Sequence, residues 1–308
     1  MDPSNRTTVG LRVDVDTRRG LDEGVPRLLE LFRHRRVRAS FFVTMGPDHS
    51  GRAIRRALRP SFLAKMWRTN PFKLYGLRTL FSGTLVPARL VSAGAPALLR
   101  RIAGEGHEVA PHGWDHVGWQ DRIHRLDRLA IRADLDLAAR AVAAAVGVAP
   151  HASAAPGWRP SAVALAVQDD LGFHYASDTR GETPFRPKVG AGVLATLQVP
   201  TTMPTMDELL GRVPDVLGTL ARAVRPGVNV FTLHAEVEGG ALLAAFETFL
   251  VELGRRGVAF AGLDDVAARA LAAADEVPVA PVVRGSVDGR SGWIAAQAWA
   301  RRGEPSIR

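Results

Sequence analysis

Eight short apolar stretches, alternating with helical patterns, constrain this chain more than any other feature of its sequence. The apolar stretches cover residues 9–15, 39–44, 107–111, 152–155, 173–177, 194–199, 229–234 and 258–261. Helical patterns cover residues 23–35, 122–146, 160–171, 207–224 and 240–256. Strands that alternate with helices are typical of parallel β/α units. Because a closed parallel sheet needs about eight such units, we predict an α/β fold with a (β/α) barrel of seven or eight parallel strands.

A long insertion follows the second predicted strand. About 50 residues separate it from the next helical pattern near residue 95, where a βα loop normally takes about 2–6. From residue 49 to residue 104 the chain has eleven Lys or Arg and no Asp or Glu. Bulky apolar residues such as Trp67 and Tyr75 lie between these cations, a mixture that suits an anionic lipid surface. We predict that residues 47–95 contact the membrane. The alternative is a solvated basic lid, and without a nucleic-acid motif we expect no nucleic-acid partner.

Two carboxylates close the first predicted strand. Asp14 and Asp16 are two residues apart, so both side chains point to the same face of the strand. In parallel barrels the carboxyl ends of the strands are where active sites are built. The alternative is that both carboxylates cap the next helix.

Histidines follow two further strands. His112 and His116 form an HxxxH motif after the third strand, and this spacing brings two imidazoles to one face for a divalent metal. Alternatively, both are surface histidines, and Asp115 between them is a helix cap. His234 ends a later strand and precedes Glu236, although a lone histidine there is more often structural. Asp178 ends yet another strand and is placed to orient an imidazole.

Taken in this order, the motifs resemble the NodB-like polysaccharide deacetylases of carbohydrate esterase family 4. They resemble more closely the bacterial deformylases that act on 4-deoxy-4-formamido-L-arabinose-phosphoundecaprenol. The segments that carry this resemblance are GLRVDVDTRRG (10–20), EGVPRLLE (23–30), GPD (46–48), HGWDH (112–116), AAPGWRP (154–160), SDTRG with PFRP (177–187), HAEVEG (234–239) and VVRGSVDGRSGW (282–293).

The resemblance implies a distorted, NodB-like barrel and a set of residue roles. Asp16, His112 and His116 are expected to bind a divalent metal, which could be Zn, Co, Mn or Ni because all accept histidine and carboxylate ligands. Asp14 is expected to be the general base and His234 the general acid, with Asp178 orienting His234.

Two departures from the family pattern affect these roles. The family usually has two adjacent acids in its first motif, whereas Val15 separates them here and leaves the division of roles between them open. Many relatives also carry an arginine immediately before the proline of the third motif. Ala155 occupies that position here, so we expect Arg159 or Arg180 to replace the missing guanidinium.

The implied activity is hydrolysis of a linear amide C–N bond. It would remove formyl from the lipid-linked amino sugar, a step in lipid A modification and polymyxin resistance. The alternatives are a deacetylase of another N-acyl amino sugar and a catalytically silent, membrane-associated scaffold. Arg180 and Arg186 are candidate partners of the substrate phosphodiester, because guanidinium groups match phosphate oxygens. Arg159 and Glu236 are further candidate substrate contacts.

The remaining expectations concern domains and location. We predict one barrel over residues 1–275 and a C-terminal extension over 276–308 that wraps the surface; the oligomeric state is left open. The chain has no cysteine, which fits a reducing compartment. It shows neither a secretory signal nor a run of about 18 apolar residues. We therefore expect a cytoplasmic protein, peripheral on the anionic inner membrane.

Overall fold

The fold is a distorted (β/α) barrel of parallel strands, and a computed structural model describes residues 7–52, 82, 84 and 87–298 of the chain. Every predicted apolar stretch contains or overlaps one barrel strand, so the predicted fold class is confirmed. The strands are β1 (Thr8–Val15), β2 (Ser40–Val43), β3 (Glu108–Pro111), β4 (Ala152–Ser153), β5 (Tyr175–Ala176), β8 (Leu197–Gln198), β9 (Val228–His234) and β10 (Ala259–Ala261).

The barrel wall is interrupted, which is the distortion expected. One sheet has the order β10-β1-β2-β3, with β9 also paired to β1, and a second has the order β4-β5-β8. A few hydrogen bonds near the strand ends join the two sheets. Ala154 donates its backbone N–H to Pro111 O at 3.1 Å, and Thr202 donates to Val230 O at 3.1 Å. The strands therefore share one direction around the wall, and their carboxyl ends meet at one rim.

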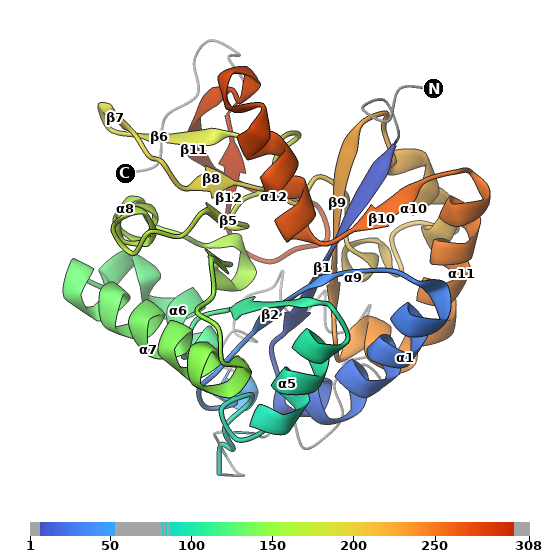
Figure 1. The fold of residues 1–308 in the computed structure, drawn as a ribbon, viewed down its shortest axis with the longest axis horizontal. Coiled ribbons are helices and arrows are strands. Elements are labelled where there is room, and N and C mark those ends of the chain that lie inside the picture. The colour runs from blue at the N-terminus through green and yellow to red at the C-terminus, as the bar shows by residue number, and fades with distance from the viewer. Residues whose placement is uncertain (1–6, 53–81, 83, 85–86, 299–308) are drawn as a thin grey trace.

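Helices cover the outside of the barrel, as Figure 1 shows. They are α1 (Val25–Arg35), α5 (Pro96–Gly104), α7 (Arg128–Val146), α8 (Ala162–Asp170), α10 (Val216–Ala223), α11 (Leu243–Arg255) and α12 (Leu263–Ala272). Aromatic rings fill the space between the helices and the wall. Phe32 of α1 lies 6.1 Å from Phe41 of β2 and 6.2 Å from Phe246 of α11, between ring centroids. Each ring is fully buried, and such edge-to-face pairs contribute about 1 kcal/mol beyond their buried area.

Two predicted helices are broken in the structure. The pattern over 122–146 covers the end of α6 (His116–Arg122), the short η4 (Ile123–Arg125) and then α7. Asp127 restarts the helix because its carboxylate accepts the N–H of Ala130 at 2.8 Å. The pattern over 207–224 divides into α9 (Met206–Leu209) and α10. Pro214 interrupts it, and Asp215 caps α10 through Gly218 N at 2.7 Å.

The segments that follow β1 and β9 are locked together. They form η2 (Gly20–Gly24) and η6 (Val237–Ala241). A Cβ on Gly24 would lie 1.9 Å from the carbonyl oxygen of Ala235, so only glycine permits this approach. The close packing fixes the carboxyl end of β1 relative to that of β9.

The C-terminal extension is built into a third sheet. After η7 (Ala274–Glu276), β11 (Val279–Gly285) and β12 (Ile294–Gln297) join β6 (Arg186–Val189) and β7 (Gly192–Val193) in the order β12-β11-β6-β7. This segment, for which no strand was predicted, has regular structure as far as residue 297. Its strands form because β11 pairs with β6, far away in the sequence.

The predicted basic insertion, residues 47–95, lies for most of its length outside the described residues. Its ends are described, and Gly46 donates its N–H to Trp114 O at 2.9 Å. Among the helices of the described part of the chain, none is long and apolar enough to cross a membrane.

Candidate metal centre and active site

The three predicted metal ligands lie close together at the carboxyl rim of the barrel. Asp16 directly follows β1, His112 directly follows β3, and His116 begins α6. The Nε2 atom of His112 lies 3.4 Å from Asp16 Oδ1, and Nε2 of His116 lies 3.2 Å from Asp16 Oδ2. One ligand atom from each residue lies within 4.8 Å of the others. This arrangement matches the predicted metal site.

The donor set fits a divalent cation. His112 Nδ1 is hydrogen-bonded to Ala154 O at 2.8 Å, which turns its Nε2 toward Asp16 in the way that metal-binding imidazoles are usually held. Burial lowers the pKa of His112 to about 4, so the ring is neutral and its Nε2 lone pair is available. Among the described residues, His112 Nε2 and Asp16 Oδ1 are buried and have no hydrogen-bond partner. Orphaned buried atoms of this kind are expected where an ion binds.

The loop between the two histidines has its own support. Asp134 of α7 accepts the N–H of Trp114 at 2.9 Å and of Asp115 at 3.3 Å. Asp115 in turn caps α6 by accepting the N–H of Gly118 at 2.9 Å. Asp115 is thus the cap that the alternative interpretation of the HxxxH motif proposed, and the histidines nevertheless face Asp16. By capping α6, Asp115 fixes the start of that helix, and His116 is its first residue.

Asp14 forms an ion pair with an arginine from its own strand. Arg12 donates from Nε to Asp14 Oδ1 and from Nη2 to Oδ2, both at 2.7 Å. Both side chains are almost fully buried. Burial by itself raises the pKa of Asp14, but the charge of Arg12, the neighbouring His112 and the hydrogen bonding from Arg12 together hold the pKa below its usual value. Asp14 is therefore an ionised carboxylate 3.6 Å from His112 Nε2.

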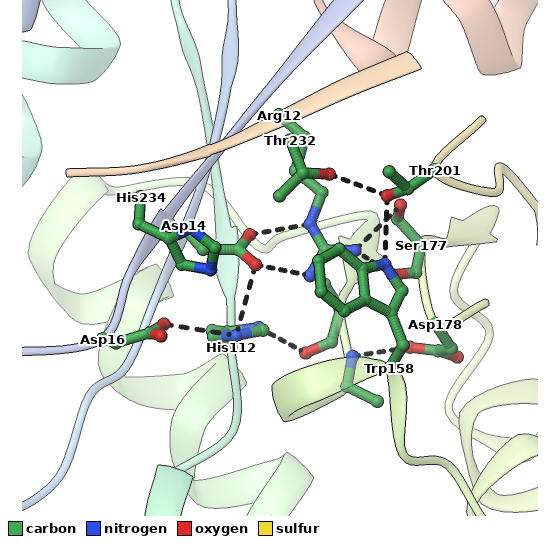
Figure 2. Close-up of polar contacts among 12 residues, drawn as sticks. Arg12, Asp14, Asp16, His112, Trp158, Ser177, Asp178, Thr201, Thr232 and His234 are labelled. Carbon is green, nitrogen blue, oxygen red and sulfur yellow. Dashed lines mark hydrogen bonds and ion pairs between the residues drawn. The ribbon is translucent and has the colours of Figure 1, made fainter. Parts of the chain in front are cut away.

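Two aromatic rings and the residue after β5 hold Arg12 in place, and Figure 2 shows Trp158 and Ser177 beside it. Its guanidinium carbon lies 5.3 Å from the ring centre of Phe42 and 5.1 Å from that of Trp158. Nη1 donates to the Ser177 hydroxyl at 3.2 Å and also to its carbonyl. Trp158 lies in η5 (Pro156–Trp158) with φ at +54°, a strained value for a bulky residue. Its indole N–H donates to Thr201 at 3.0 Å.

The expectation that Arg159 or Arg180 supports Asp14 was wrong. Arg159 donates to backbone oxygens of Gln120 at 3.2 Å, Ser291 at 3.1 Å and Trp293 at 3.0 Å. Those bonds fasten α6 and the C-terminal sheet to η5. Arg180 pairs with the buried Glu208 at 2.8 Å and donates to Met203 O at 2.8 Å. Both guanidinium groups are thus committed to other partners, and Arg12 occupies the position beside Asp14.

His234 reaches the same centre from the neighbouring strand. It is the last residue of β9 and the register partner of Asp14 on β1. Its backbone N–H donates to Glu238 at 2.7 Å, and burial raises the pKa of that Glu238 carboxyl to about 8. Figure 2 shows the His234 ring beside Asp14, on the side of the metal ligands. The general acid and general base expected from the sequence are therefore neighbours.

Asp178 lies elsewhere than expected. Its Oδ1 accepts the N–H of Ala155 at 2.6 Å and its Oδ2 accepts the side-chain amide of Gln198 at 3.1 Å. Within the described part of the chain, no hydrogen bond or ion pair joins Asp178 to His234, which differs from the expected orienting role. Ala155 directly follows Ala154, whose carbonyl accepts from His112. Asp178 therefore supports His112 through the backbone.

The two other candidate substrate contacts differ in position. Arg186 lies on β6 in the C-terminal sheet and donates to the carbonyl of Ala195, so its described contact is structural. Glu236 follows β9 and is 5% exposed. Its Oε2 has no hydrogen-bond partner among the described residues. Burial and the charge of Asp16 raise the pKa of Glu236 well above its usual value. Glu236 thus remains a candidate for contact with a neutral group of a substrate.

Sequence reasoning missed Arg12, although a signal was present. Arg12 precedes Asp14 by two residues, as Asp14 precedes Asp16, so the period of the strand puts all three on one face. A charged residue in the middle of an apolar strand is the signal that it is paired. Asp134 was also missed, and nothing in its helical position indicates its contact with a loop twenty residues earlier.

Comparisons with known proteins agree with this geometry. The family model described as polysaccharide deacetylase matches residues 2–176. A protein of Shewanella sediminis, named as a probable 4-deoxy-4-formamido-L-arabinose-phosphoundecaprenol deformylase, is 36% identical over 97% of this chain and 97% of its own length. A protein of the same name from Wigglesworthia glossinidia brevipalpis is 33% identical over 90% and 98%. A putative polysaccharide deacetylase from Mycobacterium smegmatis has a similar fold, with a TM-score of 0.60 at 20% identity over 93% of this chain and 97% of that one.

Proposed function

Because this chain belongs to the polysaccharide deacetylase family, we propose that it is a metal-dependent amide hydrolase. Its substrate is 4-deoxy-4-formamido-L-arabinose-phosphoundecaprenol, and its products are formate and the lipid-linked 4-amino sugar. The observation that carries this proposal is the meeting of Asp14, His234 and the Asp16–His112–His116 triad at one rim. The names of the two relatives reported above support the choice of substrate.

The metal would be held by Asp16, His112 and His116. A Zn, Co, Mn or Ni ion bound by this set supplies Lewis acidity to the acyl carbonyl and makes water easier to deprotonate. The charges are balanced for this purpose. Asp16 contributes one negative charge to the triad and His112 is neutral, so a divalent ion keeps a net positive charge toward the substrate.

Asp14 serves as the general base. Its pKa lies below the usual value, with the charge and hydrogen bonding of Arg12 among the causes that together exceed the effect of burial, and both its oxygens are fixed by hydrogen bonds from Arg12. Each oxygen still has a lone pair for a further donor. Asp14 takes a proton from the water that attacks the formyl carbon, and the water oxygen forms the new bond to that carbon.

His234 serves as the general acid. When the C–N bond breaks, the sugar nitrogen needs a proton to leave as an amine, and imidazole is the side chain best suited to give one near neutral pH. The backbone of His234 is held by Glu238, while its ring lies beside Asp14. The water oxygen and one of its protons end on formate, and the amine receives the proton that His234 gives. Buried Glu236 is proposed to bind a sugar hydroxyl.

The proposed setting is the inner face of the bacterial inner membrane, where the lipid carrier is anchored. The acid-free segment over residues 49–104 supports this, because its cations suit anionic head groups. In the proposed pathway the free amine reaches lipid A and lowers its negative charge, which protects against polymyxin. Flotation with liposomes containing anionic lipid at low salt tests the docking, and protein that stays at the bottom of the gradient would refute it.

Two alternative functions each differ from the proposed one in a single respect. A deacetylase of another N-acyl amino sugar would use the same five residues, since formyl and acetyl differ by one methyl, worth about 1–3 kcal/mol of discrimination. A catalytically silent scaffold would keep the barrel without the chemistry. The paired Arg12 and Asp14 beside a complete ligand set favour an enzyme.

One assay separates the three functions. Metal-reconstituted protein is incubated with the formamido-arabinosyl polyprenyl phosphate in detergent, and formate is measured, with Asp14→Asn and His112→Ala beside it. Formate from the wild type and from neither variant is the expected result. Acetate release from acetylated amino sugars, without formate, would assign the deacetylase function. No product from either substrate, with metal bound and the fold intact, would favour the scaffold.

A further inference from the structure

Helix α6 places a glutamine beside the metal ligands. His116 is its first residue and Gln120 follows one turn later, so both side chains lie on one face of the helix. The side-chain nitrogen of Gln120 lies 3.4 Å from Nε2 of His116. No motif of the sequence had pointed to Gln120, because its place depends on where α6 begins. The Asp115 cap sets that beginning.

The imidazole atom that Gln120 approaches is the one that faces Asp16. Nε2 of His116 lies 3.2 Å from Asp16 Oδ2, within the ligand cluster. A neutral imidazole nitrogen has a single lone pair, so it can accept from the amide of Gln120 or bind a cation, but not both. With a cation in the site, the Gln120 amide stays at the edge of the centre and donates to another acceptor.

Hydrogen bonds to the backbone hold the part of α6 that carries Gln120. Arg159 donates to the backbone carbonyl oxygen of Gln120 at 3.2 Å, and Trp119 Nε1 donates to the backbone carbonyl of Arg159 at 2.9 Å. Gly157 leaves room for the side chain, since a Cβ there would lie 2.6 Å from the Gln120 amide nitrogen. Gly157 also has φ at +64°, which glycine adopts without strain. Helix α6 and η5 thus hold Gln120 at the centre from both sides.

We propose that Gln120 contacts the substrate, donating a hydrogen bond to a neutral oxygen of the amino sugar or of its acyl amide. This inference rests on the proposed function and adds a specificity residue to it. A carboxamide suits this position because it offers both donor and acceptor atoms and leaves the charge of the centre unchanged. Gln120 and Glu236 then approach the sugar from two different segments. Gln120 lies on α6, which comes after β3, and Glu236 lies just after β9.

The first measurement is substrate binding without turnover. In an Asp14→Asn background, the Kd for the formamido-arabinosyl polyprenyl phosphate is compared with and without Gln120→Ala, at saturating Co²⁺. One neutral hydrogen bond is worth about 0.5–1.5 kcal/mol, so Kd should rise about 2- to 10-fold. In the active enzyme, Gln120→Ala should lower kcat/KM by a similar factor. Asp121→Ala, an exposed neighbour on the same helix, is the matched control and should change neither value.

The second measurement separates substrate contact from support of the metal site. Co²⁺ affinity, measured by chelator competition, should be unchanged in Gln120→Ala. If Gln120→Ala weakens Co²⁺ binding but leaves substrate Kd at saturating Co²⁺ unaltered, Gln120 only supports His116 and the inference is overturned. An unaltered Kd and kcat/KM would overturn it as well. A wild type that releases no formate would instead refute the proposed function.

Discussion

Replacing Arg12 with methionine should damage both stability and catalysis, because it leaves Asp14 buried without its counter-ion. Arg12 has no exposed surface, and the side chain of Asp14 is 3% exposed. Removing one partner of such a pair costs about 3–5 kcal/mol, against a total stability of about 5–15 kcal/mol for a folded protein. Arg12→Met should therefore still fold, with an unfolding midpoint in urea that is clearly lowered.

The catalytic loss follows from position and from charge. Both oxygens of Asp14 lose the hydrogen bonds that orient them, and displacement of a catalytic group by about 1 Å can cost about 10²-fold in rate. Burial, which raises the pKa of Asp14, is then unopposed by Arg12. The acid limb of the kcat profile should move to higher pH. KM and Co²⁺ content should change little, because Arg12 contacts neither the substrate nor the ligand triad.

A double variant and a control test this reasoning. Arg12→Met combined with Asp14→Asn removes both charges, and should recover most of the stability that Arg12→Met loses, since replacing a whole buried pair costs far less than breaking it. Arg38, whose side chain is 46% exposed in its ion pair with Asp264, provides the matched control, and Arg38→Met should cost about 1 kcal/mol or less. If Arg12→Met costs no more than Arg38→Met, or if the double variant is as unstable as the single one, the ion pair does not have the role assigned to it.

Three other outcomes are expected. Burial raises the pKa of Glu108 to about 7 from an ordinary 4.5, so the stability tied to its proton is complete below pH 4.5 and is lost as pH rises through about 7. Glu108→Gln should therefore melt higher than the wild type at pH 8 and nearly equally at pH 4, and equal melting at both would contradict this. Asp178→Asn should weaken Co²⁺ binding about 10-fold, measured by chelator competition, because Asp178 supports His112 through Ala155. Unchanged Co²⁺ affinity together with altered proton delivery would instead indicate that Asp178 orients His234. Saturating Co²⁺ at about 100 times its Kd should stabilise the wild type by about 2.7 kcal/mol, seen as a raised Tm, and an equal rise in His112→Ala would argue against the assigned ligands.

The barrel could be predicted from the sequence because its signal is local. Each parallel strand is a short apolar run, and a strand buried on both faces shows this in a few residues. The helix bounds were less predictable. Asp127 starts a new helix by accepting from Ala130, although the apolar pattern continues without interruption. The C-terminal strands were missed since β11 depends on β6, and neither has a buried apolar run of its own.

The residues of the candidate site were also predictable only in part. Asp16, His112 and His234 could be found because each stands at the end of a strand, where the fold brings distant segments together. His116 could be found from its spacing to His112. The partners of Asp178 could not, because its position depends on the side chain of Gln198 and the loop at Ala155. The arginine beside Asp14 was sought in the third motif, where the family pattern places it. The structure has it on β1, since the requirement is for a charge at that point and not for a particular segment.

This position of Arg12 also explains how two acids separated by Val15 take different roles. Arg12, Asp14 and Asp16 lie on one face of one strand, spaced by its period of two. The guanidinium of Arg12 covers one side of both Asp14 oxygens, which limits that carboxylate to a single further partner on each oxygen. Asp16 directs Oδ1, which has no hydrogen-bond partner among the described residues, toward His112, and Oδ2 toward His116. This difference supports the proposal that Asp14 takes the proton and Asp16 holds the metal. Moving the arginine by one residue would turn it to the opposite face of β1 and remove that distinction.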